Sequence, residues 1–158
     1  MSHTTDAVSC SRVTQERQGE PARSELKPSA VIDAYWLGAE CKTSNFKKPT
    51  GRAGKWLVYL SLGQIDEYWA KIKNATEDGQ LGYSAKVSTA RPNPLASSKA
   101  KVIVVYTYDW KDKEDVFRVR EALRRLGIVR KIPYKTNADT LAGKYKQTTA
   151  KRISKYYS

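Results

Sequence analysis

The last third of the chain combines ammonium groups, guanidinium groups and phenol rings in a way that suits phosphate binding. Residues 130–158 include eight basic residues and only one acidic residue, Asp139. The basic residues are Arg130, Lys131, Lys135, Lys144, Lys146, Lys151, Arg152 and Lys155. The whole chain has a formal net charge of +13. Such a chain attracts polyanions such as phosphates, nucleic acid or acidic membranes.

Two short segments of this region have the composition of a phosphate-binding turn. The first contains Tyr134, Lys135 and Thr136, and in the second Lys144 follows a glycine. Lysines, hydroxyl groups and exposed backbone N–H groups together can cradle a phosphoryl group. The alternative is a solvated basic tail, and the two segments alone do not separate these interpretations.

The scarcity of histidine excludes several kinds of catalysis from the folded part. His3 is the only histidine in the sequence. The folded part therefore has no histidine to serve as an imidazole base, as a zinc ligand or in a Ser-His-Asp triad. Cys10 and Cys41 have no CxxC spacing, which indicates reduced thiols in a cytoplasmic protein and no metal site. We expect no cofactor.

The glycines and the lysine at residues 51–55 (GRAGK) only partly resemble a nucleotide-binding phosphate loop. They lack the GxxxxGK[ST] spacing, and they lead into a predicted strand where a phosphate loop leads into a helix. A glycine-rich hairpin entry is the preferred interpretation.

Hydrophobic periodicity predicts the elements that must position these residues. Alternation predicts strands at residues 55–61, 83–89, 101–108 and 128–134, with Pro133 favouring an edge position for the last. Helical spacing predicts helices at residues 65–75 and 112–126. The order strand, helix, strand, strand, helix, strand is a split βαβ arrangement. It predicts an α+β fold, with an antiparallel sheet and both helices on one face.

The opposite face of this sheet is expected to stay open. Lys55 and Lys86 fall on the polar sides of their strands, so both should line it. Trp56 and Trp69 fall on core stripes, and Trp110 alone is kept as a candidate for stacking on a ligand. Four arginines of the second helix are expected on its solvent side or on an RNA-facing patch. They are Arg118, Arg120, Arg124 and Arg125.

The ends of the chain carry weaker signals. Residues 1–28 are polar and aperiodic, which predicts a disordered leader. Residues 30–40 predict a short helix or an extended arm packed through Ile32, Tyr35 and Trp36. The domain is expected at residues 30–145 and a basic tail at 146–158. The N-terminal segment lacks the apolar centre of a signal peptide, and no apolar run has membrane-spanning length, so we expect a cytoplasmic protein with no membrane partner.

Several motifs resemble one family. The segments GKWLVYL, LGYSAKVSTARPN, VYTYDWKDKEDVFRVREALRRLGI and YKTNADTLAGKY occur in the order of the basophilic-leukaemia-expressed (Bles) family. The similarity covers about residues 34–145. It implies a fold like that of the cap-binding translation initiation factor 4E, but no established activity.

The same fold group is distantly similar to the phosphothreonine lyases, which remove phosphate by β-elimination. This resemblance implies Lys86 as the base and Lys55 as a second catalytic lysine. It places Lys135 and Lys144 where a lyase has phosphate-binding arginines, with Arg91 or Lys99 as a further contact. Leu57 occupies the position of the acid histidine, and loss of a general acid costs about 10²–10⁴ in rate.

The sequence therefore predicts a binding domain for a phosphorylated partner, which is RNA, a nucleotide or a phosphopeptide. The predicted phosphate contacts are Lys55, Lys86, Arg91, Lys99, Tyr134, Lys135 and Lys144. The alternatives are a lyase with Lys86 as its base and a scaffold whose basic surface only aids solubility. The sequence does not indicate an oligomeric state.

Overall fold

A computed structural model of the protein describes residues 26–94, 99–141 and 154–158. In this part of the chain one antiparallel sheet has six strands, in the order β1-β3-β4-β2-β5-β6. The strands are β1 (Trp36–Glu40), β2 (Gly54–Leu60), β3 (Ser84–Ser88), β4 (Lys101–Thr107), β5 (Pro133–Thr136) and β6 (Tyr156–Tyr157). The helices are η2 (Pro28–Ala30, a 3-10 turn), α2 (Leu62–Glu77), α3 (Lys113–Arg125) and α4 (Asn137–Leu141).

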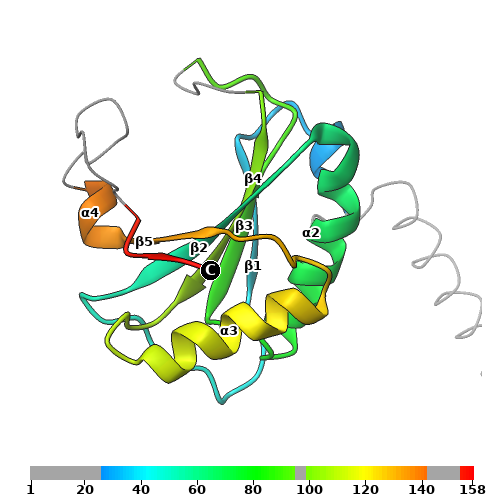
Figure 1. The fold of residues 1–158 in the computed structure, drawn as a ribbon. Coiled ribbons are helices and arrows are strands. Elements are labelled where there is room, and N and C mark those ends of the chain that lie inside the picture. Colours follow the sequence, from blue (N-terminus) through cyan, green and yellow to red (C-terminus); the bar gives the residue numbers. More distant parts are fainter. Residues whose placement is uncertain (1–25, 95–98, 142–153) are drawn as a thin grey trace, which may run out of the picture.

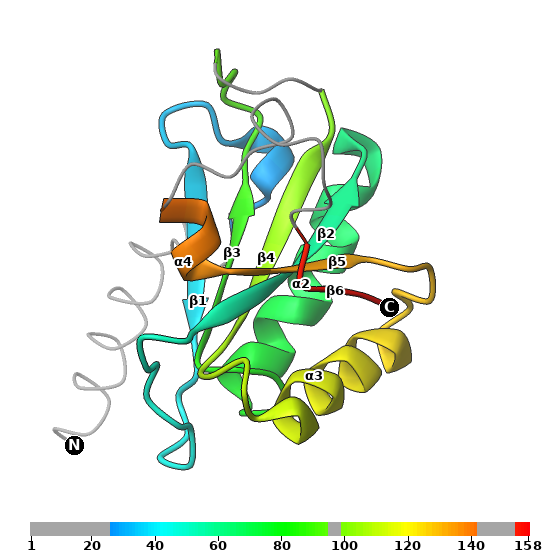
Figure 2. The same cartoon turned by 60° about the vertical axis from the view of Figure 1, so that its left-hand side comes forward.

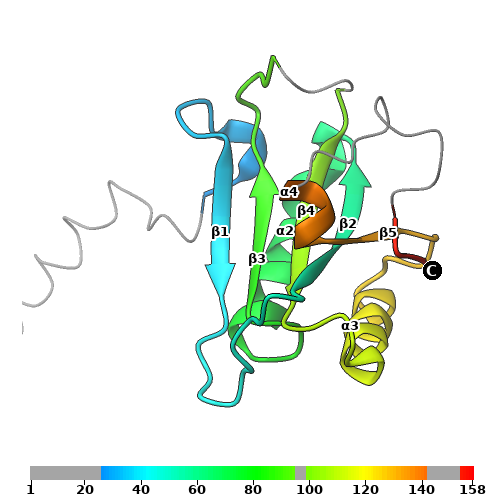
Figure 3. The same ribbon diagram turned by 90° about the vertical axis from the view of Figure 1, so that its left-hand side faces the viewer.

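The helices lie on both sides of the sheet, but unequally. The long helices α2 and α3 cover one face (Figure 1). The short helix α4 lies against the opposite face, in front of the middle strands (Figures 2 and 3). The face that α4 shares is called the open face below. No helix of the described residues is long and apolar enough to cross a membrane.

The predicted α+β fold with an antiparallel sheet is confirmed. The segments β2, α2, β3, β4, α3 and β5 follow the predicted order, and all their strand pairs are antiparallel. In β2 the side chains of Trp56, Val58 and Leu60 are buried, as the alternation predicted. They pack against α2 and α3, and the Trp56 ring nitrogen donates to the Val116 carbonyl of α3 at 3.0 Å.

The first part of the domain differs from the prediction. Residues 30–40 form no helix; after the η2 turn the chain pairs with β3 as strand β1. The inward residues are Leu37 and Ala39, whereas Ile32 is 74% exposed. Successive side chains of a strand point to opposite faces, so Leu37 and Ala39 enter the core and Trp36, which was expected to pack there, does not. Residues 1–25 of the expected leader lie outside the described residues, and Pro28 at its end is buried.

The expected strand at 128–134 is also placed differently. Strand β5 begins only at Pro133 and lies inside the sheet, since it pairs with β2 on one side and β6 on the other. Arg120 explains why residues 128–132 leave the strand path. Its buried guanidinium donates hydrogen bonds to the carbonyl oxygens of Ile128 at 2.8 Å, Arg130 at 2.6 Å and Ser158 at 2.9 Å. Arg120 is thus a structural residue and does not lie on the solvent side of α3.

The end of the expected basic tail belongs to the sheet. Tyr156 and Tyr157 form β6, and residues 142–153 lie outside the described residues. Ile132 and Ser158 exchange two backbone hydrogen bonds of 2.7 and 3.1 Å. The Tyr156 ring packs against Tyr134 and Phe117, with centroids 5.4 and 5.3 Å apart.

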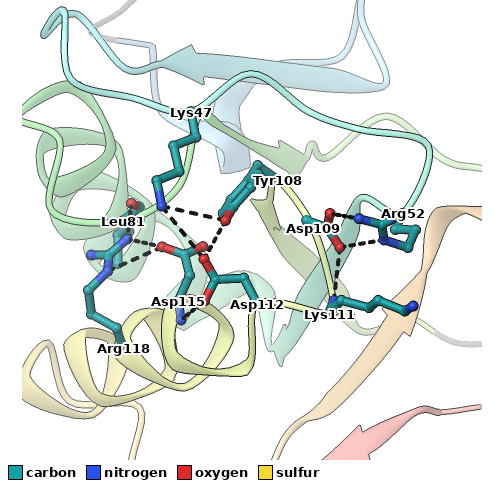
Figure 4. Close-up of polar contacts among 9 residues, drawn as sticks. All are labelled: Lys47, Arg52, Leu81, Tyr108, Asp109, Lys111, Asp112, Asp115 and Arg118. Atoms are coloured by element: carbon teal, nitrogen blue, oxygen red, sulfur yellow. Dashed lines mark hydrogen bonds and ion pairs between the residues drawn. The ribbon is translucent and has the colours of Figure 1, made fainter.

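Carboxylates near the start of α3 are used in local polar contacts (Figure 4). Asp112 caps the helix by accepting from the Asp115 N–H at 3.1 Å, and it pairs with Lys47 at 3.6 Å. Arg118 joins the Asp115 carboxylate at 2.9 Å to the Leu81 carbonyl at 3.0 Å. Asp112 and Asp115 are therefore each paired with a nearby cation, Lys47 and Arg118 respectively.

Candidate functional site

Three strands bring lysines together on the open face. Lys55 of β2 lies directly opposite Lys135 of β5 in the strand register. Lys86 of β3 pairs with Val104 of β4, which in turn pairs with Leu57 of β2. All three lysine side chains are half-buried. Lys135 is on the strand next to Lys55, about 4.8 Å away, and Lys86 is two strands away across β4. The charges of both act on Lys55. We call Lys55, Lys86 and Lys135 the lysine cluster.

Lys55 is the most perturbed member of the cluster. Burial, followed by the charges of Lys86 and Lys135, lowers its pKa from 10.5 to about 8. Desolvation and nearby like charges both disfavour an ammonium ion. Its Nζ donates to the Asn137 Oδ1 at 3.1 Å. Among the described residues no carboxylate forms an ion pair with Lys55 or Lys86.

Two residues that the sequence reasoning missed complete the surroundings of Lys55. Asn137 is the first residue of α4, and its side chain also bonds to Tyr83. Burial is the main cause of the raised pKa of Tyr83. An Asn directly after Lys135 and Thr136 was a usable signal, because that residue follows a predicted phosphate-binding segment. The signal for Tyr83 was weaker, since it was expected within a strand.

Lys86 has an aromatic neighbour. Its Nζ lies 4.1 Å from the centroid of the Trp36 ring. Trp36 is on β1, where the sequence predicted an arm. The cation over the ring face is a favourable contact that holds Lys86 on the open face.

The remaining predicted site residues lie elsewhere. Arg91 and Lys99 line a hollow of about 1030 Å³ that also includes Trp36, at the opposite end of the open face from Lys55. Arg91 lies 4.2 Å from the centroid of Tyr35 and donates to the Asp33 carbonyl at 3.2 Å. Lys144 lies outside the described residues.

Tyr134 is corrected from a phosphate contact to a core residue. Its side chain is fully buried on the helix-covered face, 5.1 Å from Trp56 between ring centroids. Its hydroxyl shares a 2.6 Å hydrogen bond with Thr107, and burial raises its pKa. Gly54 is required beside it, because a Cβ there would overlap the Tyr134 ring. Alternation along β5 explains the error, since Tyr134 and Lys135 must face opposite ways.

Trp110 is also engaged within the fold. It is partly buried against the core, and the Lys155 ammonium lies 3.9 Å from its ring centroid. Leu57, at the position of the lyase histidine, is only 6% exposed. Among the described residues no group of three His, Cys, Asp or Glu side chains could hold a metal ion.

The chemistry of the cluster follows from its charges. Three ammonium groups, one carrying a proton that is weakly held, gather beside an amide and a phenol. Such a site favours a multiply charged anion with oxygen acceptors. It also has a lysine that is partly neutral at mildly alkaline pH.

Comparison with known proteins agrees with the expected family and fold. The model of the family described as "Basophilic leukemia-expressed protein Bles03" matches residues 46–142. A schistosome eIF4E crystallised with m7GpppA and 4E-BP is similar in structure, with a TM-score of 0.59 and 14% identity. That match covers 93% of this chain and 80% of the other. The same protein with m7GpppG and 4E-BP gives a TM-score of 0.58, with equal identity and coverage. The fold is therefore eIF4E-like.

Proposed function

The chain belongs to the Bles03 family, and we propose that the open face of its sheet binds the phosphate groups of a nucleotide, an RNA or a phosphopeptide. The observation that carries this proposal is the lysine cluster. Burial, followed by the charges of Lys86 and Lys135, lowers the pKa of Lys55 to about 8, although the three lysines come from strands that are distant in sequence. Lys144 remains a proposed fourth contact, and Arg91 and Lys99 remain proposed outer ones.

The physical reason is that like charges at a half-buried site destabilise one another until an anion arrives. Each ammonium group donates up to three hydrogen bonds, and charge-assisted bonds to phosphate oxygens are stronger than neutral ones. A phosphate would turn the mutual repulsion of the lysines into attraction. A scaffold that uses its charge only for solubility has no need to gather lysines on a sheet face.

The fold neighbours support a nucleotide among the possible ligands. The two schistosome eIF4E structures were obtained with m7GpppA and m7GpppG. Both molecules carry a chain of phosphates between two nucleosides. A fold that accommodates such a ligand in one protein supports, by analogy, phosphate recognition on the same fold here.

A lyase is the second candidate, and one observation favours it. A lysine whose pKa is near 8 is deprotonated often enough to accept a proton near neutral pH. That lysine is Lys55, the second catalytic lysine of this alternative, whereas the resemblance assigns the base to Lys86. The buried Leu57 at the acid position weighs against it, because the leaving phosphate would lack the aligned proton donor. Binding is therefore the better supported function.

Titration calorimetry with inorganic tripolyphosphate tests the binding proposal. We expect Lys55→Met, Lys86→Met and Lys135→Met each to weaken binding roughly tenfold, the loss of one charge-assisted contact. The matched control is Lys113→Met, which removes an exposed lysine from α3 on the other side of the sheet. Equal weakening by the control would show non-specific attraction and contradict the proposal.

Mass spectrometry separates the binder from the lyase. A phosphothreonine peptide incubated with the protein should stay intact if the domain only binds. Loss of phosphoric acid that disappears in Lys86→Ala would establish the lyase instead.

A further inference from the structure

A hollow of about 1030 Å³ lies at the end of the open face away from Lys55. Three exposed aromatic side chains line it: Tyr35 and Trp36, each 41% exposed, and Tyr59, 47% exposed. Aromatic rings at a surface are costly in contact with water, and these three share one concavity. None of the three belongs to the hydrophobic core cluster of the described residues.

The strand register places two of these rings in one row across the sheet. Trp36 pairs with Ser88, Ser88 bonds to Val102 of the next strand, and Val102 pairs with Tyr59. Three strand spacings put the backbones of Trp36 and Tyr59 about 14 Å apart. Both rings are exposed and line the same hollow, so each offers a surface on which a base can stack.

The hollow is also strongly cationic. Its described lining residues include Arg91, Lys99, Lys101 and Arg130, and no carboxylate is among them. Arg91 lies over the Tyr35 ring, and Arg130 donates to the Tyr59 carbonyl. Cations are thus held beside the rings, where the phosphates of a stacked nucleotide would lie.

Trp36 joins the hollow to the lysine cluster. It lines the hollow, and its ring also carries the Lys86 ammonium at 4.1 Å. Lys86 pairs with Gly38, two residues from Trp36, so the two side chains occupy successive rows of the open face. A single nucleic-acid strand could therefore place its bases on the aromatic rings of the hollow and its phosphates on the lysine cluster.

We propose that this hollow binds unpaired bases of a single-stranded nucleic acid whose phosphates lie on the lysine cluster. This inference rests on the proposed function and names its ligand class. A phosphopeptide offers no row of aromatic faces to stack on Tyr35, Trp36 and Tyr59. A duplex has its base faces already stacked internally, so it cannot use these rings.

Fluorescence anisotropy with a dye-labelled single strand of about eight nucleotides tests the proposal. Trp36→Leu and Tyr59→Leu remove a ring but keep apolar volume, and each should weaken binding about tenfold. Trp36→Phe keeps a ring and should retain most of the affinity. Phe46→Leu is the control, because Phe46 is 42% exposed and does not line this hollow. Thermal unfolding monitored by circular dichroism checks that every variant is folded.

The outcomes separate this inference from the proposed function. Unchanged oligonucleotide affinity in both Leu variants, or equal affinity for the matching duplex or a phosphopeptide, would overturn the inference while tripolyphosphate binding could still depend on the lysines. If Lys55→Met and Lys86→Met bind tripolyphosphate as the wild type does, the proposed function fails, and this inference fails with it. Reduced single-strand affinity with unchanged tripolyphosphate affinity in Tyr59→Leu is the expected result, because Tyr59 lines the hollow and, unlike Trp36, does not carry Lys86.

Discussion

Lys55 carries the clearest energetic consequence at the residue scale. Its pKa is 10.5 when unperturbed and about 8 in the folded protein, so the folded protein binds this proton less tightly than the unfolded chain does. The charged side chain therefore destabilises the free protein below pH 8. As the pH rises from about 8 to 10.5 the folded form loses the proton first, and wild-type stability should increase.

Replacing Lys55 by Met should consequently stabilise the ligand-free protein at pH 7. We expect a gain on the order of 1 kcal/mol, since solvent screening reduces the effect at a half-exposed side chain. Urea unfolding at pH 7 and pH 10 measures it, and the difference between wild type and variant should shrink at pH 10. Lys113→Met is the control and should change stability little at either pH. A Lys55→Met protein that is less stable than the wild type would contradict the pKa shift.

The same titration should appear in ligand binding. Only protonated Lys55 attracts an anion, so sulfate, whose own charge is constant above pH 6, should bind more weakly as the pH rises through about 8. In Lys55→Arg the guanidinium stays charged, and the decline near pH 8 should disappear. Calorimetric titration between pH 6.5 and 9.5 checks both proteins. A wild-type affinity that is flat over this interval would count against Lys55 as a contact.

Individual residues differed in how far the sequence revealed them. Alternation placed Lys55 and Lys86 on one face because strand period two fixes the direction of each side chain. The same rule would have moved Tyr134 into the core if residues 134–136 had been taken as strand and not as turn. Trp36 was expected to pack a short helix or an extended arm onto the domain, and its place on the open face was not predicted. Its contact with Lys86 depends on which strands are neighbours, which no local pattern contains.

At the element scale, β5 illustrates what local patterns omit. The segment before it, residues 128–132, has strand composition but does not form a strand. Arg120 of α3 holds that segment in place by donating hydrogen bonds to the carbonyls of Ile128 and Arg130. A buried arginine that binds carbonyls resembles any other helix arginine in sequence, so the register of β5 was not predictable. Strand β6 is only two residues long and has no periodicity to detect.

Arg120 should therefore be important for stability. Arg120→Met keeps much of the apolar volume but leaves three carbonyls without their donor, and we expect a loss of about 2–4 kcal/mol in the free energy of unfolding. Arg125→Met, at an exposed position of the same helix, should cost little. Urea unfolding gives both values.

Hydrogen exchange provides a local check on the same residue. The Ile132 and Ser158 amides, which bond across to each other's carbonyls, should exchange faster in Arg120→Met. Unchanged exchange at these amides and unchanged stability would contradict the role of Arg120 in holding β6 against β5.

At the scale of the whole molecule, basic residues outnumber acidic ones and the two are unevenly distributed. The chain has 29 lysines and arginines against 16 acids. Carboxylates near α3 are occupied by Lys47, Arg52 and Arg118 (Figure 4), while the open face gathers the lysine cluster without an ion pair to Lys55 or Lys86 among the described residues. The order of the elements and the alternation were sufficient to predict an antiparallel sheet with helices on one face, but not the strands β1 and β6. The convergence of Lys55, Lys86 and Lys135 required the strand order, which places β4 between β3 and β2.

The central claim is that these three ammonium groups form one anion site. A crystal structure grown with selenate tests it directly, because selenium gives an anomalous signal that locates the anion. We predict a selenate ion bound in the cluster, with oxygens about 3 Å from the Nζ atoms of Lys55, Lys86 and Lys135. Selenate found at other surfaces while the cluster holds none, or the three Nζ atoms turned away from one another, would contradict the account.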